Sequence, residues 1–150
     1  MPTTIHVVVE TNVLADRVLE VAYDFSARRA EVWPAVSVKH LKVHRLGDTS
    51  AEVTEGTRAG IVVWERCHYD WSQPGSVKAS VLDSNVYEPG STWEIRATPR
   101  NGGSRVEMIW VRDFRGSLGA RLLGTVYRRA GQRMFEKDAR RVINTLEKGV

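Results

Sequence analysis

Three residues of one segment have side chains that could move a proton or hold an anion: Arg66, His68 and Asp70, within WERCHYDW. Side chains alternate between the two faces of a strand, so in an extended segment these three share one face. His68 is the candidate for catalytic proton transfer, with Asp70 as its partner, because imidazole titrates nearest to neutral pH. An inward-facing Arg66 requires a counter-charge. It therefore predicts either a structural ion cluster or an anchor for a carboxylate, phosphate or phenolate.

The sequence contains none of the common motifs of phosphate, metal or nucleophile chemistry. It has no GxGxxG turn, no P-loop, no HExxH pair and no GxSxG elbow. His40 and His44 would lie about 13 Å apart in an extended segment, which is too far for one metal ion. Cys67 is the single cysteine, so an internal disulfide is excluded, and its neighbour His68 would face the other side of a strand. We therefore predict no metal site and no cofactor.

Residue periodicity and turn signals predict the elements that position these side chains. A strand is expected over 5–12, a helix capped by Asp16 and ending near Phe25, and a short helix over 28–33 that Pro34 ends. Six runs between turns, rich in β-branched and aromatic residues, are predicted strands: 37–46, 51–55, 60–71, 76–83, 92–99 and 104–114. Apolar residues from Leu118 to Leu146 recur at helical spacing and predict one long amphipathic helix.

Alternation also predicts which residues line the interior between this sheet and this helix. On the last strand the set with Glu107 and Asp113 is the more charged, so the other set is placed inward. On 60–71 both faces carry apolar bulk. We take Glu65 as outward, which turns its neighbours inward. The predicted ligand-lining residues are Trp64, Arg66, Val77, Ala79, Val81, Trp93, Ile95, Met108, Trp110, Arg112, Leu123 and Tyr127. The same residues could instead pack a dry core.

The long helix carries most of the positive charge. Residues 119–148 hold eight Lys or Arg and three Asp or Glu, in a chain whose net charge is +4. Such a face is either simply solvated or a docking face for anionic lipid headgroups or nucleic acid. Gly116, Gly119, Gly124 and Gly131 lie in or beside this helix and indicate either close packing on the sheet or a hinge at 115–119.

The order of these elements resembles the helix-grip fold of the START/SRPBCC superfamily, and more narrowly its polyketide cyclase/dehydrase and lipid-transport group. The local resemblance rests on Trp33-Pro34, WERCHYDW, STWE at 91–94 and the arginine-rich last helix. It implies one α+β domain over 1–150, in which a curved antiparallel sheet of seven strands wraps a long C-terminal helix. Two short helices would join the first two strands, and an apolar cavity would separate sheet and helix.

The resemblance implies a protein that binds a lipid, polyketide or aromatic metabolite as carrier or sensor. One alternative is a cyclase, aromatase or dehydratase in which His68 and Asp70 act in the same cavity, with Tyr69, Tyr87 and Tyr127 as further proton-transfer candidates. Another is a toxin-like module that contacts the ribosome or its RNA through the basic helix. We expect a cytoplasmic protein, because the sequence shows neither a signal peptide nor a membrane span. We also expect a monomer or homodimer that does not bind DNA.

Overall fold

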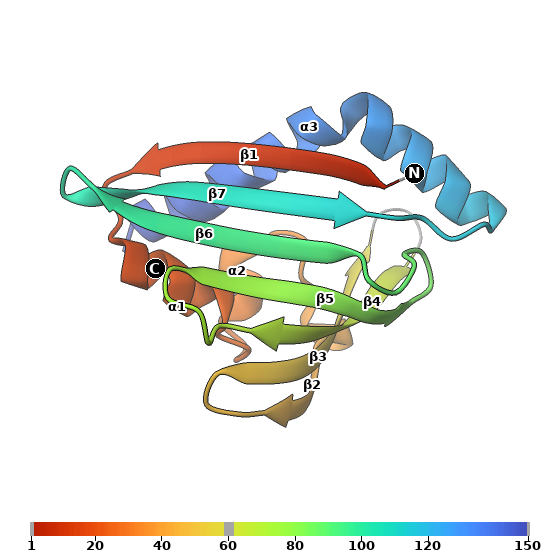
Figure 1. The fold of residues 1–150 in the computed structure, drawn as a ribbon, viewed down its shortest axis with the longest axis horizontal. Helices are drawn as coiled ribbons and strands as arrows, with labels where there is room; N and C mark the ends of the chain where they lie inside the picture. The colour runs from red at the N-terminus through yellow and green to blue at the C-terminus, as the bar shows by residue number, and fades with distance from the viewer. Residues whose placement is uncertain (1, 59–61, 150) are drawn as a thin grey trace.

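The computed structural model describes residues 2–58 and 62–149. Seven strands form one antiparallel sheet in the order β1-β7-β6-β5-β4-β3-β2, and a long helix lies along one of its faces (Figure 1). The elements are β1 (Thr3–Thr11), α1 (Ala15–Ala22), α2 (Arg29–Val32), the 3-10 helix η1 (Val38–His40), β2 (Lys42–Leu46), β3 (Ser50–Arg58), β4 (Val62–Asp70), β5 (Ser76–Ser84), β6 (Thr92–Arg100), β7 (Gly103–Arg112) and α3 (Leu118–Glu147). The predicted α+β class and the order of elements are confirmed.

Some predicted boundaries are wrong. The run 37–46 is split, because Ser37 donates to the Gly56 carbonyl at 3.1 Å and η1 follows before β2 begins. The first helix begins at Ala15 with Leu14 as its N-cap, so Asp16 lies within its first turn. The strand predicted over 51–55 is longer at both ends, and the start of 60–71 lies outside the described residues.

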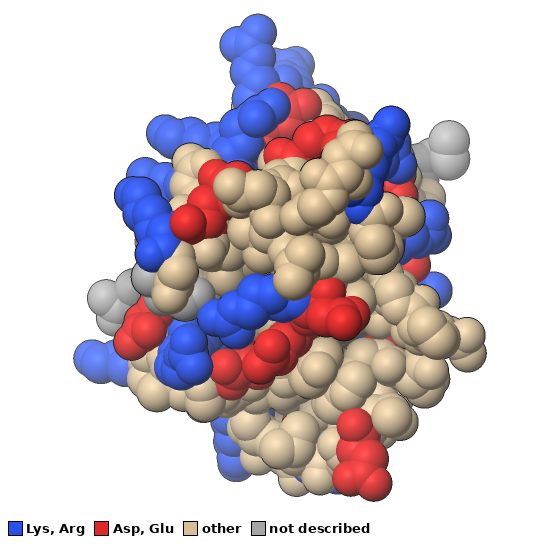
Figure 2. Space-filling view, turned by 90° about the vertical axis from the view of Figure 1, so that its left-hand side faces the viewer, with Lys and Arg blue, Asp and Glu red and all other residues tan. Residues whose placement is uncertain are grey.

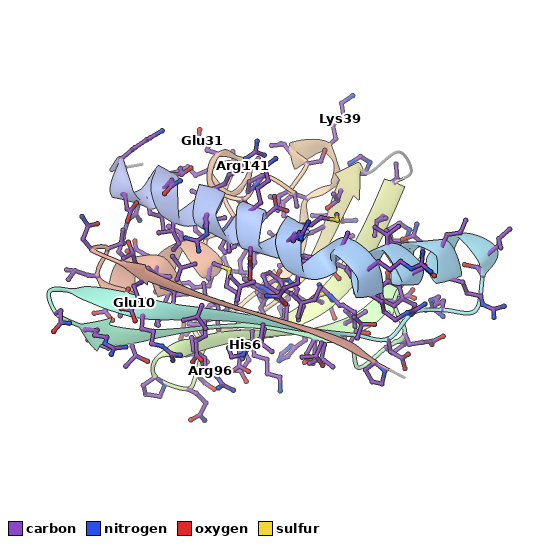
Figure 3. The ribbon with its side chains drawn as sticks, turned by 90° about the horizontal axis from the view of Figure 1, so that it is seen from above. His6, Glu10, Glu31, Lys39, Arg96 and Arg141 are labelled. Carbon is purple, nitrogen blue, oxygen red and sulfur yellow. The ribbon has the colours of Figure 1, made fainter. Side chains whose placement is uncertain are left out.

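Alternation along β1 shows how the sheet separates its two faces. Ile5, Val7 and Val9 are buried under α3, whereas His6 and Glu10 project from the opposite face (Figure 3). β1 pairs with β7 over its whole length, from Thr3 opposite Arg112 to Thr11 opposite Ser104. This pairing joins the last strand of the β meander, β7, to β1, the strand that α3 contacts most.

A bulge in β5 changes which side chains face the interior. Arg66 pairs with Asp83 but the next residue, Cys67, pairs with Val81, so Leu82 is the extra residue. Leu82 and Asp83 are therefore both exposed, and Ser84 returns to the buried face, where its hydroxyl donates to the Trp64 carbonyl at 2.7 Å.

The two halves of α3 pack differently. The C-terminal half buries Ala139, Val142, Ile143 and Leu146, whereas the N-terminal half buries only small residues. A Cβ atom at Gly131 would lie 2.7 Å from Ile5 Cδ1, and one at Gly124 would lie 3.1 Å from Phe114 Cγ, whereas one at Gly116 or Gly119 would meet nothing within 4 Å. Close packing therefore accounts for Gly124 and Gly131.

Candidate functional site

A cavity of about 240 Å³ lies between the sheet and α3. The helix contributes Tyr127, Met134, Phe135, Asp138, Ala139 and Val142, and the sheet contributes residues of β3, β4, β6 and β7. The segment from Trp33 to Val36, after α2, closes part of one side. The lining is mostly apolar with a few charged groups, as small-molecule sites commonly are.

Aromatic rings form a continuous wall of this cavity. The ring centroid of Trp93 lies 5.4 Å from that of Trp33 at nearly a right angle, and 6.5 Å from that of Trp110. Trp110 in turn lies 4.5 Å from Phe135 of α3. These separations lie in the range of attractive edge-to-face and offset contacts, and such a wall offers the same contacts to an aromatic guest.

Arg29 is the centre of a buried ion cluster at one end of the cavity. Its Nε and Nη2 donate to the two carboxylate oxygens of Glu55, both at 3.1 Å, and Nη2 also donates to the Tyr69 hydroxyl at 3.1 Å. Its Nη1 donates to the carbonyls of Ala22 and Asp24 at 3.0 and 3.2 Å. All five N–H donors of the guanidinium are thus used within the protein.

This saturation points to a structural role for the Arg29 cluster. Burial lowers the pKa of Arg29, but the attraction of Glu55 and Tyr69 and the hydrogen bonds to both together more than offset this, so the pKa is raised. Burial raises the pKa of the Tyr69 hydroxyl. The cation also lies over the ring of Phe25 at 4.7 Å. The cluster therefore ties the α1–α2 segment to β3 and β4, and it leaves no donor for a ligand.

Arg112 forms a second buried ion pair, and this one is not saturated. Its Nη1 and Nη2 donate to the Glu65 carboxylate at 3.0 and 3.4 Å, and its guanidinium lies 4.5 Å from the Tyr87 ring centroid. Among the described residues, no group accepts a hydrogen bond from its Nε, which is buried, or from Nε1 of Trp93. Burial lowers the pKa of Arg112, but attraction to Glu65, with smaller contributions from Tyr87 and Tyr127, more than offsets this and raises it, so the cation persists inside the protein. Unused donors on a buried cation favour binding of an acceptor.

A pair of tyrosine hydroxyls lies beside Arg112. The Tyr87 and Tyr127 oxygens are 2.7 Å apart, and both residues line the cavity. Burial raises the pKa of each, so both hydroxyls keep their protons well into the alkaline range. The pair can therefore donate a proton or a hydrogen bond, but it does not supply a base at neutral pH.

The predicted inward face of β4 is wrong. Val63, Glu65, Cys67 and Tyr69 face the interior, so Trp64, Arg66, His68 and Asp70 lie on the other face of the strand, away from the cavity. The reason is that Glu65 is held inside by Arg112.

The outward residues have partners of their own. Arg66 pairs with Glu52 on the neighbouring strand. Asp70 accepts hydrogen bonds from the backbone N–H and the hydroxyl of Ser72, at 2.8 and 2.7 Å, and so caps the turn after β4. The catalytic pair predicted from His68 and Asp70 therefore does not face the cavity.

The remaining predicted lining residues divide into two groups. Trp93, Met108, Trp110, Arg112 and Tyr127 line the cavity. Val77, Ala79, Val81 and Ile95 do face inward, but they are packed in the core, and Leu123 lies at its edge. Sequence reasoning missed Arg29, Glu55 and Glu65 as interior polar groups. It named Tyr69 as a proton-transfer candidate, but the facing it assigned to 60–71 turned that residue outward. The requirement that a buried Arg112 have an acid partner within the interior was the available signal for Glu65.

Comparison with known proteins shows similarity of structure without similarity of sequence. No protein-family profile matches the chain, and no curated protein matches its sequence. The Zhui aromatase/cyclase from Streptomyces sp. R1128 has a similar structure, with a TM-score of 0.80 at 15% identity over 99% of this chain and 95% of its own. A START superfamily protein from Mycobacterium smegmatis matches with a TM-score of 0.76 at 9% identity over 98% of this chain and 99% of its own. The chain has the helix-grip fold of the START/SRPBCC superfamily.

A further helix-grip structure, the protein TTHA0849 from Thermus thermophilus, matches with a TM-score of 0.79 at 12% identity over 99% of this chain and all of its own length. The predicted fold is thereby confirmed. Within residues 2–58 and 62–149, no helix has the length and apolar character needed to cross a bilayer. In the same ranges, no three His, Cys, Asp or Glu side chains are grouped to hold a metal ion.

Proposed function

We propose that this helix-grip protein binds a small aromatic molecule in the cavity between the sheet and α3, as a carrier or sensor. The observation that carries the proposal is an aromatic-walled cavity with a buried arginine that retains unused donors. The volume of about 240 Å³ is below the roughly 300–1,000 Å³ of sites for drug-sized ligands. The ligand is therefore small, or α3 moves outward to admit a larger one.

The charge at the polar end of the cavity limits the ligand's chemistry. Arg112 and Glu65 neutralise each other, so the pair attracts a full negative charge much less than a lone arginine would. A carbonyl or phenol oxygen can accept from the unused donors without disturbing this balance. The proposed ligand is thus an aromatic compound with a neutral oxygen acceptor.

Titration with 2-naphthol, followed by tryptophan fluorescence, tests the proposal, because Trp33, Trp93 and Trp110 line the cavity. We expect saturable quenching that Ala139→Phe abolishes, since this residue is buried against the cavity. Ala130→Phe adds the same ring to the same helix at a half-buried position outside the lining, so it serves as the matched control. Circular dichroism establishes that both variants fold. Absence of quenching, or equal quenching in both variants, would contradict the proposal.

An enzymatic role in the same cavity is the second candidate. It is supported by the Tyr87–Tyr127 hydroxyl pair and by the structural likeness to aromatase/cyclases. A protonated hydroxyl beside a bound carbonyl could act as general acid in a cyclisation or dehydration. Tyr127→Phe should then abolish turnover of a poly-β-ketone substrate while 2-naphthol affinity stays within a few-fold. Turnover that survives this change would exclude the assigned role.

A further inference from the structure

The first turns of α3 expose three large apolar side chains on one side of the helix. Leu118 is 78% exposed, Leu122 62% and Val126 44%. Residues four apart are neighbours on a helix surface, so these side chains form one continuous patch, here called the apolar tip. In Figures 1 and 3 this end of α3 reaches beyond the ends of the strands, so the sheet does not cover it.

Exposed basic residues continue along the helix from the apolar tip. Arg129, Arg133, Lys137 and Arg141 follow at the same four-residue spacing, and all are exposed. Between Leu118 and Phe135 the helix contains four arginines and no acidic residue. Figure 2 looks at the end of the molecule away from the tip and shows Lys and Arg side chains at its upper, left-hand and right-hand margins, with Asp and Glu among them.

We propose that α3 docks on the surface of an anionic lipid bilayer, with the apolar tip inserted among the acyl chains and the basic residues at the headgroups. An amphipathic helix with leucines on one part of its surface and arginines beside them has the properties of an interfacial helix. Each basic residue close to an anionic leaflet adds to the attraction.

Other occupants fit this surface less well. A symmetric dimer places the same surface of each copy against the other, so two positively charged helix faces would be brought together and would repel. A nucleic acid would satisfy the arginines but would leave Leu118 and Leu122 in water. The anionic bilayer is the occupant that accounts for both the apolar and the basic residues.

The docking surface is also continuous with the cavity. Met134 is 45% exposed on α3, and it lines the cavity as well. Asp138, one turn further along, lines the cavity too, and burial raises the pKa of its carboxyl. A helix seated on a bilayer would hold this opening close to the lipid phase. The route for a ligand rests on the proposed function, whereas docking itself does not.

Sedimentation with vesicles tests the docking. The protein should bind vesicles of phosphatidylcholine with 30% phosphatidylserine, bind phosphatidylcholine vesicles much less, and dissociate in 0.5 M NaCl. Leu118→Ser with Leu122→Ser should lower the partition coefficient by about ten-fold or more, because less apolar area enters the bilayer. Leu46→Ser is the matched control, because Leu46 is 64% exposed on the β2–β3 hairpin, and it should have no effect.

Charge variants complete the test. Arg129→Gln with Arg133→Gln should weaken binding by about five-fold for each charge removed, whereas Lys42→Gln with Lys78→Gln, also exposed, should not. Equal binding to both vesicle types would overturn the proposal, as would a dimer abolished by the leucine changes, or RNA binding without vesicle binding. Because 2-naphthol titration is measured without lipid, failure of docking and failure of cavity binding are separate results.

Discussion

The Glu65–Arg112 pair gives a direct test of the interior that the structure describes. The side chains are 21% and 7% exposed, and they connect β4 with β7 across the cavity. Removal of one partner of a buried pair leaves an uncompensated charge and typically costs about 3–5 kcal/mol. Because Glu65 keeps some contact with solvent, we expect Glu65→Met and Arg112→Met each to lower the free energy of unfolding by about 3 kcal/mol.

The double variant should be much less damaging than the sum of the single ones. Replacing both members of a buried pair with apolar side chains of similar length is often nearly neutral. The free energy of coupling between the two positions should therefore be at least about 2 kcal/mol. Domains of this size have about 5–15 kcal/mol of stability, so the single variants should still fold.

Urea denaturation followed by tryptophan fluorescence and circular dichroism measures these changes, provided that the slopes agree among variants. The exposed pair of Glu10 and Arg100, with side chains 59% and 53% exposed, is the control and should couple by about 0.2–1 kcal/mol. A coupling at Glu65–Arg112 no larger than this would refute the inward placement of Glu65.

Further predictions concern glycines, the cysteine and the tyrosines. Gly119→Ala should stabilise the protein by up to about 1 kcal/mol, because the added Cβ meets nothing within 4 Å. Gly103→Ala should destabilise it strongly, because the added Cβ would lie 2.0 Å from the Thr11 carbonyl oxygen. Thermal melting of the two variants measures both changes. Burial raises the pKa of Cys67, so a thiol reagent should label it only after unfolding, and rapid labelling of the native protein would contradict its placement. Because the pKa values of Tyr87 and Tyr127 are raised in the folded protein, the unfolded chain releases these protons first. Their contribution to stability should therefore be constant below about pH 10 and fall above it. Ionisation of these tyrosines in the native protein near pH 10, measured by absorbance at 295 nm, would count against this.

The order of elements was predictable because each signal is local. Turn residues separate the strands, adjacent strands then pair as hairpins, and the change of period after Gly116 marks α3. The single strand predicted over 37–46 was wrong, because the break between η1 and β2 depends on a tertiary contact. The His40 side chain occupies the space above Gly56, where a Cβ would come within 2.5 Å of His40 Cβ. No neighbouring residue in the sequence indicates that contact.

The inward face of β4 was not predictable from alternation, because apolar and charged residues occur on both faces of the strand. The argument that a charged residue marks the outer face worked on β7 at Glu107 and failed on β4 at Glu65. The difference is that Glu65 has a cationic partner across the interior, 47 residues further along the chain. A rule that predicts which face of a strand points to the interior must therefore consider pairs of charges. An acidic and a basic side chain can be buried together although neither would be buried alone.

The two buried arginines show where sequence reasoning about sites must stop. A sequence can indicate that Arg112 needs an acid, as Arg29 also does, but it cannot count how many donors each has left once folded. Arg29 uses all of its donors on Glu55, Tyr69 and main-chain carbonyls, so it can only hold the fold together. Arg112 gives its bonds to Glu65 alone among the described residues and faces the cavity. Residues of the same type, equally buried, thus differ in what they can bind, and the difference lies in the number of unused donors.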